Sequence, residues 1–170
     1  MNYTQEPKKP AEDIDLLSST SSQSEFIAFE GNSKHKIQKL EIFSEEEIVK
    51  VEAFIDDLYE EYKIREDVYG HIMTTVTEAV NNGLIHGNKL DPTKKVTITS
   101  RLISSYLLSF TVQDEGDGFD FEAVIQKDIE TVLENYHKTG RGIGIFLMRS
   151  LTDSFQFIGK GNIVELVFHI

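Results

Sequence analysis

The sequence predicts an α+β sandwich, in which one sheet is covered by helices on one face. Apolar residues at helical spacing crowd into the first half of the chain, whereas paired strand patterns fill most of the second half. The chain has 170 residues, of which 39% are hydrophobic, so one domain with a substantial core is expected. We assign this domain to residues 36–170 and a polar N-terminal arm to residues 1–35.

The arm and the first strand differ in their patterning. Residues up to about Ser24 are polar and rich in serine, which is typical of a segment without a core of its own. Phe26, Ile27 and Phe29 allow at most a short edge strand there. Ile37–Phe43 alternates between apolar and polar residues and predicts the first strand of the domain.

A first helix is predicted directly after this strand. Ser44 and Glu47 have the spacing of a capping box, and Phe43 and Ile48 occupy the positions of a hydrophobic staple. One face of the helix is apolar and the other is acidic. The apolar face consists of Ile48, Val51, Ile55, Leu58 and Tyr62, with Phe54 beside it.

A second helix is predicted over Asp67–His86, with Gly87-Asn88 as its C-terminal stop. A short helix is expected later, over Gly142–Leu151. Ser104-Ser105 predicts a tight connection between two strands, and Gly159–Asn162 predicts a hairpin turn between two more. The four alternating strand segments are Val96–Leu102, Tyr106–Val112, Phe155–Ile158 and Ile163–Ile170.

Composition and charge limit the classes of function. The 29 acidic residues outnumber the 17 Lys and Arg and give a net charge of −12, so direct binding to nucleic acid or to an anionic membrane is not expected. The acidic excess fits either a basic protein partner or a solvated face. There is no cysteine, which excludes disulfides and thiol catalysis. Without a signal peptide or a membrane-length apolar stretch, the chain is expected to be cytoplasmic.

Three short constellations carry chemistry. In the first, Glu78 and Asn82 are four residues apart on the predicted second helix and therefore share a face. A carboxylate beside a carboxamide oxygen suits a Mg²⁺-phosphate site, and the Glu could accept a proton from an attacking hydroxyl. Taken alone, this pair is better explained as an ordinary polar helix face.

The second constellation is Asp114-Glu115-Gly116-Asp117-Gly118. Asp114 continues the buried face of the strand before it, so its carboxylate needs a hydrogen-bond donor, which a purine amine would supply. Gly116 and Gly118 would let a flat ring approach the backbone. The alternative is an acidic hairpin or calcium-like turn.

The third constellation is Gly140-Arg141-Gly142-Ile143-Gly144, which leads into the predicted short helix. Closely spaced glycines at a helix start leave backbone N–H groups that can point at an anion. A lid hinge is the alternative. What favours a nucleotide site is that all three constellations occur once each, in this order, in one small domain.

At these motifs the sequence resembles the GHKL, or Bergerat-fold, ATP-binding superfamily. TEAVNNGLIHGN is similar to its N box, DEGDGF to its first glycine box and GRGIGI to its second. The compact size and the run GRGIGIFLMRSLTDSFQF most resemble the bacterial anti-sigma factor serine kinases of partner-switching systems. The resemblance covers about Ile37–Ile170 and implies a two-layer α/β sandwich with a mixed, mostly antiparallel sheet.

The resemblance also implies roles for single residues. Glu78 matches the general base, Asn82 the Mg²⁺ ligand and Asp114 the acceptor for the adenine amino group, while Gly116 and Gly118 match the adenine wall. Arg141 occupies a position at which the family's loop varies. The matching phosphate loop consists of Gly140, Arg141, Gly142, Ile143 and Gly144.

Two further regions are compared with the family. Residues Phe119–Thr139 match the lid over the nucleotide and are short here. The first helix departs from the pattern, because these kinases often carry bases there and Lys50 is its only base before Lys63. None of the five histidines has zinc-ligand spacing. His86 lies four residues after Asn82, so it either faces the nucleotide or, as is more usual at a helix C-terminus, interacts with the helix dipole, and it is not counted among the site residues.

The resemblance implies an ATP- and Mg²⁺-dependent serine/threonine protein kinase that acts as an anti-sigma factor. Its expected partners are a small STAS-type antagonist, which would receive the γ-phosphate, and a sigma factor; family analogy alone implies a homodimer. A rival from another class is an ATP-controlled protein-binding module without phosphotransfer. A bare ATPase is a third and less attractive alternative for so small a domain.

Overall fold

The computed structural model describes residues 36–126, 129–139 and 142–170. The predicted arm with its edge strand, and the phosphate-loop residues Gly140 and Arg141, lie outside the described residues. The described part of the domain is an α+β sandwich, as the sequence predicts.

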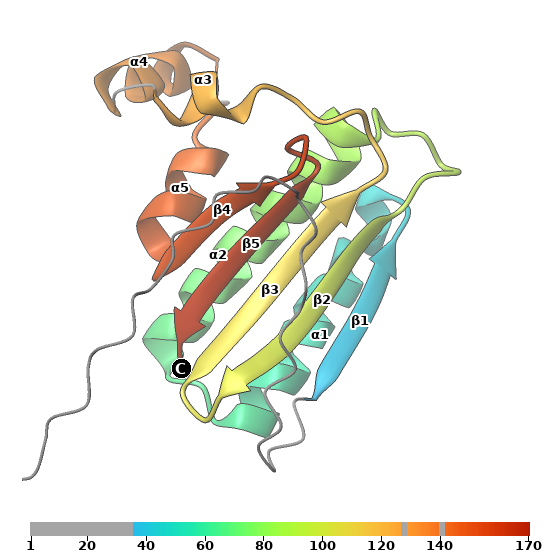
Figure 1. Ribbon diagram of the computed structural model, residues 1–170, viewed down its shortest axis with the longest axis vertical. Coiled ribbons are helices and arrows are strands. Elements are labelled where there is room, and N and C mark those ends of the chain that lie inside the picture. Colours follow the sequence, from blue (N-terminus) through green and yellow to red (C-terminus); the bar gives the residue numbers. More distant parts are fainter. Residues whose placement is uncertain (1–35, 127–128, 140–141) are drawn as a thin grey trace, which may run out of the picture. The chain divides into compact units, whose positions relative to one another are not determined.

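Five strands form one sheet in the order β1-β2-β3-β5-β4 (Figure 1). Each pairing between the described strands is antiparallel. The pairs β2–β3 and β4–β5 are hairpins, whereas β1 pairs with β2 and β5 pairs with β3. The strands are β1 (Ile37–Ile42), β2 (Val96–Ser104), β3 (Leu107–Asp114), β4 (Ser154–Ile158) and β5 (Ile163–His169).

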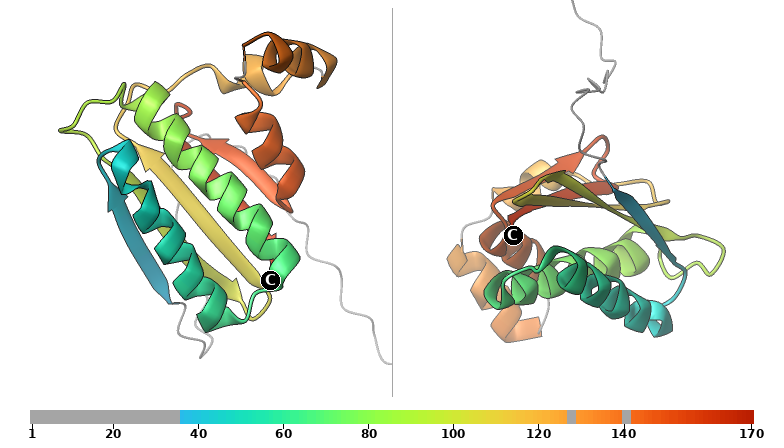
Figure 2. Two further views of the ribbon diagram at one scale, coloured as in Figure 1. Left: turned by 180° about the vertical axis from the view of Figure 1, so that it is seen from behind. Right: turned by 90° about the horizontal axis from the view of Figure 1, so that it is seen from below.

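Helices cover one face of this sheet, which gives the two layers seen in Figure 2. This layer contains α1 (Ile48–Tyr62), α2 (Glu66–Asn82) and α5 (Gly144–Leu151). A 3₁₀ turn over Glu45–Glu47 precedes α1, and α2 continues into a π-helical turn, η2 (Gly83–Gly87). Two further helices, α3 (Phe121–Ile125) and α4 (Ile129–Thr139), have no buried residue.

The core lies between the sheet and the helices. On the sheet side, the alternation predicted for the central strands is confirmed, since the helix-facing residues of β2 and β3 are almost completely buried. On the helix side, α1 and α2 contribute fully buried aliphatic side chains, each of which stabilises the fold by about 1.5–3 kcal/mol. The buried set includes Val96, Ile98, Leu108, Phe110, Val112, Val51, Ile55, Leu58, Ile72, Val76 and Val80.

The predicted capping box is wrong. Ser44 makes no side-chain cap, and the Glu47 carboxylate accepts a hydrogen bond from the backbone N–H of Phe43 at 2.9 Å instead of from that of Ser44. The reason is the interposed 3₁₀ turn. Because of this turn α1 begins only at Ile48, so Ser44 is not the N-cap residue of α1 and Glu47 is not its third residue, as a capping box requires.

Element ends differ from the predicted ones by one or two residues, which is ordinary for helix and strand termini. Tyr106 lies in the turn between β2 and β3, because β2 extends through Ser104 across an irregularity in the register. The helix α5 begins at Gly144, since Gly142 has a φ of +89°, which no right-handed helix contains. Over the described part of the chain, no helix has both the length and the hydrophobicity needed to cross a membrane.

Candidate nucleotide-binding site

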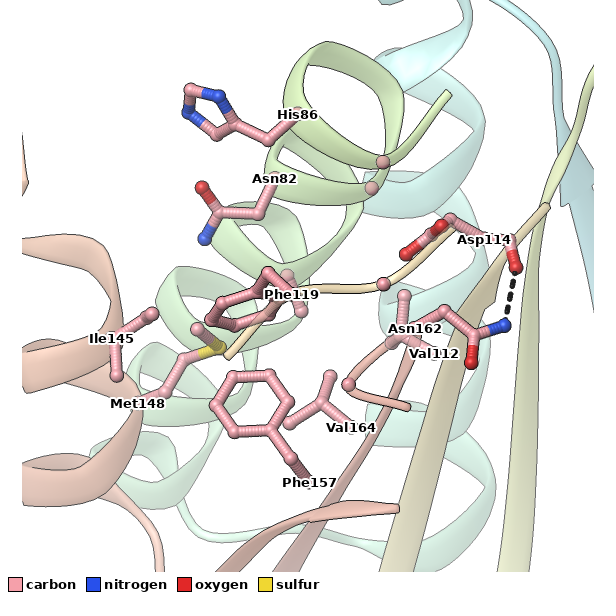
Figure 3. Close-up of a pocket in the computed structure, with 15 residues that line it drawn as sticks. Asn82, His86, Val112, Asp114, Phe119, Ile145, Met148, Phe157, Asn162 and Val164 are labelled. Carbon is pink, nitrogen blue, oxygen red and sulfur yellow. Dashed lines mark hydrogen bonds between the residues drawn. The ribbon is translucent and has the colours of Figure 1, made fainter. Parts of the chain in front are cut away.

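A cavity of about 280 Å³ lies between the helices and the sheet, at the end where β3 stops (Figure 3). Its wall is mostly apolar and combines α2 and η2 with β3, α5 and the β4–β5 hairpin. Of the residues predicted from the three constellations, Asn82, Asp114 and Gly118 line it. The complete lining is Ala79, Asn82, Gly83, His86, Gly87, Val112, Asp114, Gly118, Phe119, Ile145, Met148, Phe157, Gly161, Asn162 and Val164.

Asp114 provides the one carboxylate among these lining residues. It ends β3 on the same face as Val112, as the strand parity predicts, and its Oδ1 accepts a hydrogen bond from the Gly116 N–H at 2.7 Å. Burial raises the pKa of the Asp114 carboxyl above its ordinary value, although this hydrogen bond and the charges of Lys160 and Lys94 oppose the shift. The Asp114 side chain is partly buried, and a partly buried carboxylate favours a specific hydrogen-bond donor.

Asn162 fixes the backbone of Asp114. The Asp114 N–H donates to the Asn162 carbonyl at 3.0 Å, and the Asn162 side-chain Nδ2 donates to the Asp114 carbonyl at 3.0 Å (Figure 3). The next residue is fixed as well, because the Glu115 N–H donates to Oδ1 of the buried Asn88 at 2.8 Å. The loop that begins at Asp114 is thus hydrogen-bonded both to the β4–β5 hairpin and to Asn88, the residue that follows η2.

Glycines allow the helix to approach Asp114 closely. A Cβ atom on Gly87 would overlap the Asp114 carboxylate, and one on Gly83 would lie 2.9 Å from a methyl group of Val96 and 3.3 Å from Cβ of Asp114. Gly116 packs against the backbone carbonyl of Gly87 and does not line the cavity. The segment similar to the N box therefore lies directly against the segment similar to the first glycine box, with the backbone of Gly87 next to the side chain of Asp114.

The first and third constellations also meet. Asn82 points into the cavity from the last turn of α2 (Figure 3). Glu78, one turn earlier, does not line the cavity, but its carboxylate lies against Gly144, where a Cβ atom would overlap it. Ile143 is the partly buried residue before α5, and Gly142 supplies the left-handed backbone at the loop exit.

The β4–β5 hairpin also contacts the start of the predicted lid. Gly118 has a φ of +81° and packs against the Lys160 carbonyl, which accepts the Phe119 N–H at 3.0 Å. The rings of Phe119 and Phe157 meet edge to face with centroids 5.1 Å apart. The segment Gly159–Asn162 thus contacts both Asp114 and the first residues of the lid.

Several residues of the site were not predicted from the sequence. Gly83 and Gly87 are spaced four apart, a pattern that indicates a close approach of one helix face, and this signal was available in the sequence. Asn162 was interpreted only as a turn residue and Phe157 only as a strand residue. His86, which was left out of the predicted site, lines the cavity beside Asn82.

Comparison with known proteins identifies the family of the chain. Residues 43–168 match the family described as the histidine kinase-like ATPase domain. The chain therefore belongs to this family, whose ATPase character implies that it binds ATP, and the resemblance to the GHKL superfamily is confirmed.

Within this family, the chain is similar to anti-sigma F factors. It is 30% identical over 107 residues to that of Anoxybacillus flavithermus, which covers 61% of this chain and 71% of the relative. It is 33% identical over 107 residues to that of Geobacillus kaustophilus, with the same shares covered. With that of Clostridium perfringens it shares 30% identity over 114 residues, which covers 67% of this chain and 76% of the relative.

Proposed function

We propose that this chain is an ATP- and Mg²⁺-dependent serine/threonine protein kinase that acts as an anti-sigma regulatory factor. The observation that carries the proposal is the convergence of the three constellations on one site. Asp114 stands at one end of the cavity and Asn82 at another part of its wall, while Glu78 lies against Gly144. The anti-sigma F factors among the relatives supply the regulatory part of the proposal.

In this proposal the buried part of the cavity binds the nucleoside. Its volume of about 280 Å³ is near the lower end of ligand pockets, which suits a nucleoside whose phosphates continue toward the glycine loop. Asp114 would accept a hydrogen bond from the 6-amino group of adenine, and a guanine carbonyl at that position would face it without a proton to donate. The apolar side chains of Val112, Met148 and Phe157 would contact the ring.

The residues present fit a magnesium ion. Asn82 offers a hard amide oxygen in the cavity, and its side chain makes no hydrogen bond with the residues that the structure describes. Within the same described ranges, no cluster of three or more His, Cys, Asp or Glu side chains could hold a metal by itself. Mg²⁺ is characteristically held by few protein ligands together with phosphates and waters, and when bound it neutralises phosphate charge.

Glu78 would act as the general base. The hydroxyl oxygen of the substrate protein would form a bond to the γ-phosphorus, the bond from that phosphorus to the β–γ bridging oxygen would break, and ADP would leave. Glu78 would accept the hydroxyl proton. The backbone N–H groups of the loop that ends at Gly144 would hold the phosphate oxygens near this base.

The proposed substrate is a small STAS-type antagonist protein, and the proposed regulatory target is a sigma factor. We place this activity in the cytoplasm, where bacterial transcription takes place. No nucleic-acid contact is proposed, because the chain carries a net charge of −12.

The test is phosphate transfer from [γ-³²P]ATP to a STAS-type antagonist from the same genome. The Glu78→Gln variant is expected to lose transfer by a factor of about 10²–10⁴ while its ATP affinity stays within about twofold. Glu66→Gln, which alters an exposed acid on the same helix, is the matched control and should transfer normally. Label that persists in the Glu78→Gln variant would refute the proposed base.

Capture of the same antagonist by the chain, measured beside phosphate transfer, distinguishes the kinase from the rival binding module. A wild-type chain that captures the antagonist equally well with ATP and with a non-hydrolysable analogue, and leaves no phosphate on it, would be a nucleotide-controlled module and not a kinase.

A further inference from the structure

The loop of residues 88–95, which connects η2 to β2, projects away from the sheet and from the helices (Figure 1, Figure 2). It consists of two successive turns. In the first, the Asp91 N–H donates to the Asn88 carbonyl at 3.1 Å, and in the second the Lys94 N–H donates to the Asp91 carbonyl at 3.0 Å. Leu90 belongs to the first turn and is 53% exposed. The loop thus presents a large apolar side chain to solvent.

The backbone of this first turn is unfavourable for the two residues at its centre. Lys89 has a φ of +56° and Leu90 a φ of +57°, whereas turns with positive φ at both central residues are usually formed by Asn and Gly. A left-handed backbone is costly for a bulky residue with a Cβ atom. Such strain persists where the surrounding structure enforces it, and it is most frequent at functional sites. A lone exposed leucine is ordinary, but a leucine exposed on a strained turn points to a function.

Hydrogen bonds hold the turn in this strained form. The Leu90 N–H donates to the Leu84 carbonyl at 2.8 Å, which fixes the turn to η2. Both ends of the loop are bonded to Glu115, whose N–H donates to Oδ1 of Asn88 at 2.8 Å and whose carboxylate accepts the Lys95 N–H at 2.9 Å. The exposed leucine is therefore carried on a fixed backbone, which reduces the conformational entropy that a binding partner would have to remove.

The loop also differs in charge from the rest of the chain. The whole chain has a net charge of −12, whereas residues 88–95 contain three lysines and one aspartate. Lys95 pairs with Glu41 at 2.6 Å, but the exposed Lys89 makes no ion pair with any residue that the structure describes. An apolar side chain with an unpaired positive charge beside it in the sequence suits a protein surface that has an apolar pocket and carboxylates on the pocket rim.

We propose that residues 88–95 form a docking surface for the protein that receives the phosphate, with Leu90 in an apolar pocket of that protein and Lys89 beside carboxylates on its rim. This inference rests on the proposed function and extends it by assigning a surface to the protein substrate. Of the two partners proposed above, the charge of the loop favours the antagonist, because a sigma factor binds DNA phosphates and carries bases of its own. Neither Lys89 nor Leu90 lines the nucleotide cavity, so docking and nucleotide binding can be tested separately.

The experiment measures three properties of the full chain: affinity for the STAS-type antagonist from the same genome, phosphate transfer and urea unfolding. Leu90→Ala should weaken antagonist binding about tenfold and raise the KM for the antagonist by the same factor, while kcat and the ATP affinity change less than about twofold. Leu90→Gly should lose the same affinity but raise the midpoint of urea unfolding by about 0.3–1 M, because glycine tolerates the left-handed backbone. Lys89→Glu should weaken binding about tenfold at about 50 mM salt and much less at about 500 mM salt.

Ile37→Ala is the matched control, because Ile37 is 56% exposed but lies at the end of β1 that is remote from the loop, and it should leave the antagonist affinity unchanged. Unchanged antagonist affinity in Leu90→Ala or in Lys89→Glu would overturn the inference, as would an equal loss in Ile37→Ala. A lower urea midpoint in both Leu90 variants would also overturn it, since Leu90 would then be a residue that packs within the fold. Losses seen with the sigma factor and not with the antagonist would assign the surface to the other partner. A wild-type chain that does not bind the antagonist at all would instead refute the proposed function.

Discussion

At one end of the cavity, the loop that carries Asp114 is bonded to Asn162 and Asn88 and lies against two glycines of the helix, whereas α3 and α4, the helices of the predicted lid, contain no fully buried side chain. The first region is organised before any ligand arrives. The second consists of short helices, which are marginal in water without packing. The difference indicates that the end of the cavity that contains Asp114 is preformed, while α4 contributes little to the unliganded fold.

The largest expected effect that tests this comparison is on Asp114 itself. Asp114→Asn keeps an oxygen for the Gly116 N–H but loses the charge that favours an amino donor, so ATP affinity should fall about 100-fold, or about 2.7 kcal/mol. Titration calorimetry measures the change, and Asp117→Asn, in an exposed position of the same loop, serves as control. Equal ATP affinities for Asp114→Asn and the wild type would mean that Asp114 does not bind the adenine amino group.

The next prediction concerns the close approach of η2 to Asp114. Gly87→Ala would place a methyl group on the carboxylate, so the turn or the acid must shift, and we expect about 30-fold weaker ATP binding and a stability loss of about 2 kcal/mol. Gly70→Ala is a sharp control, because no atom lies within 4 Å of its added Cβ. That change in α2 should raise stability by about 0.5–1 kcal/mol in urea denaturation. If Gly87→Ala behaves like Gly70→Ala, the packing around Asp114 is looser than described.

A third prediction uses the pKa of Asp114, which burial raises. The folded chain without ligand binds this proton more tightly than the unfolded chain does, so its stability gains from Asp114 as the pH falls through the raised pKa. Adenosine needs the ionised carboxylate, and its affinity should fall over the same pH window, approaching tenfold for each unit below that pKa. Adenosine is the probe because it has no phosphate of its own to titrate.

Calorimetry from neutral pH down to the lowest pH at which the chain stays folded checks this prediction. The Asp114→Asn variant is the control, and its weak adenosine binding should not follow the pH in this range. A pH profile shared by the wild type and the variant would assign the titration to another group.

The smallest expected effect is on α4, in the predicted lid. Leu133→Ala in α4 removes a side chain that is 37% exposed, and it should change the free energy of unfolding by less than about 0.5 kcal/mol. Ile72→Ala, at a fully buried position in α2, should cost about 2–5 kcal/mol in the same urea experiment. A Leu133→Ala cost above about 1.5 kcal/mol would show that α4 is packed in the unliganded chain and would remove the contrast between the two regions.

Periodic features of the molecule were predictable from the sequence. The alternation of Leu108, Phe110 and Val112 fixed the face on which Asp114 projects, because a strand places every second residue on one side. The helical face of α1 was predicted in the same way. The capping box failed because it depends on the backbone of three residues, Glu45–Glu47, whose 3₁₀ turn has no periodic signature.

Contacts between distant segments could not be predicted in that manner. Asn162 and Asp114 are 48 residues apart, and a hydrogen bond from a turn side chain to a backbone carbonyl leaves no pattern in either segment. The contact of Glu78 with Gly144 is of the same kind. The family resemblance assigned both of these last residues to the site, but only the fold shows that they touch.

The contact with Glu78 gives a second reason for a glycine at position 144, in addition to the phosphate contact proposed for its backbone N–H. Any side chain at this position would occupy the volume of the Glu78 carboxylate, so the loop and the acid cannot be altered independently. An alanine there would displace the Glu78 carboxylate, the proton acceptor of the proposed function, while every backbone N–H of the loop stays in the chain. A loss of phosphate transfer on replacing Gly144 would therefore reflect the displaced carboxylate of Glu78 as much as weaker anion binding.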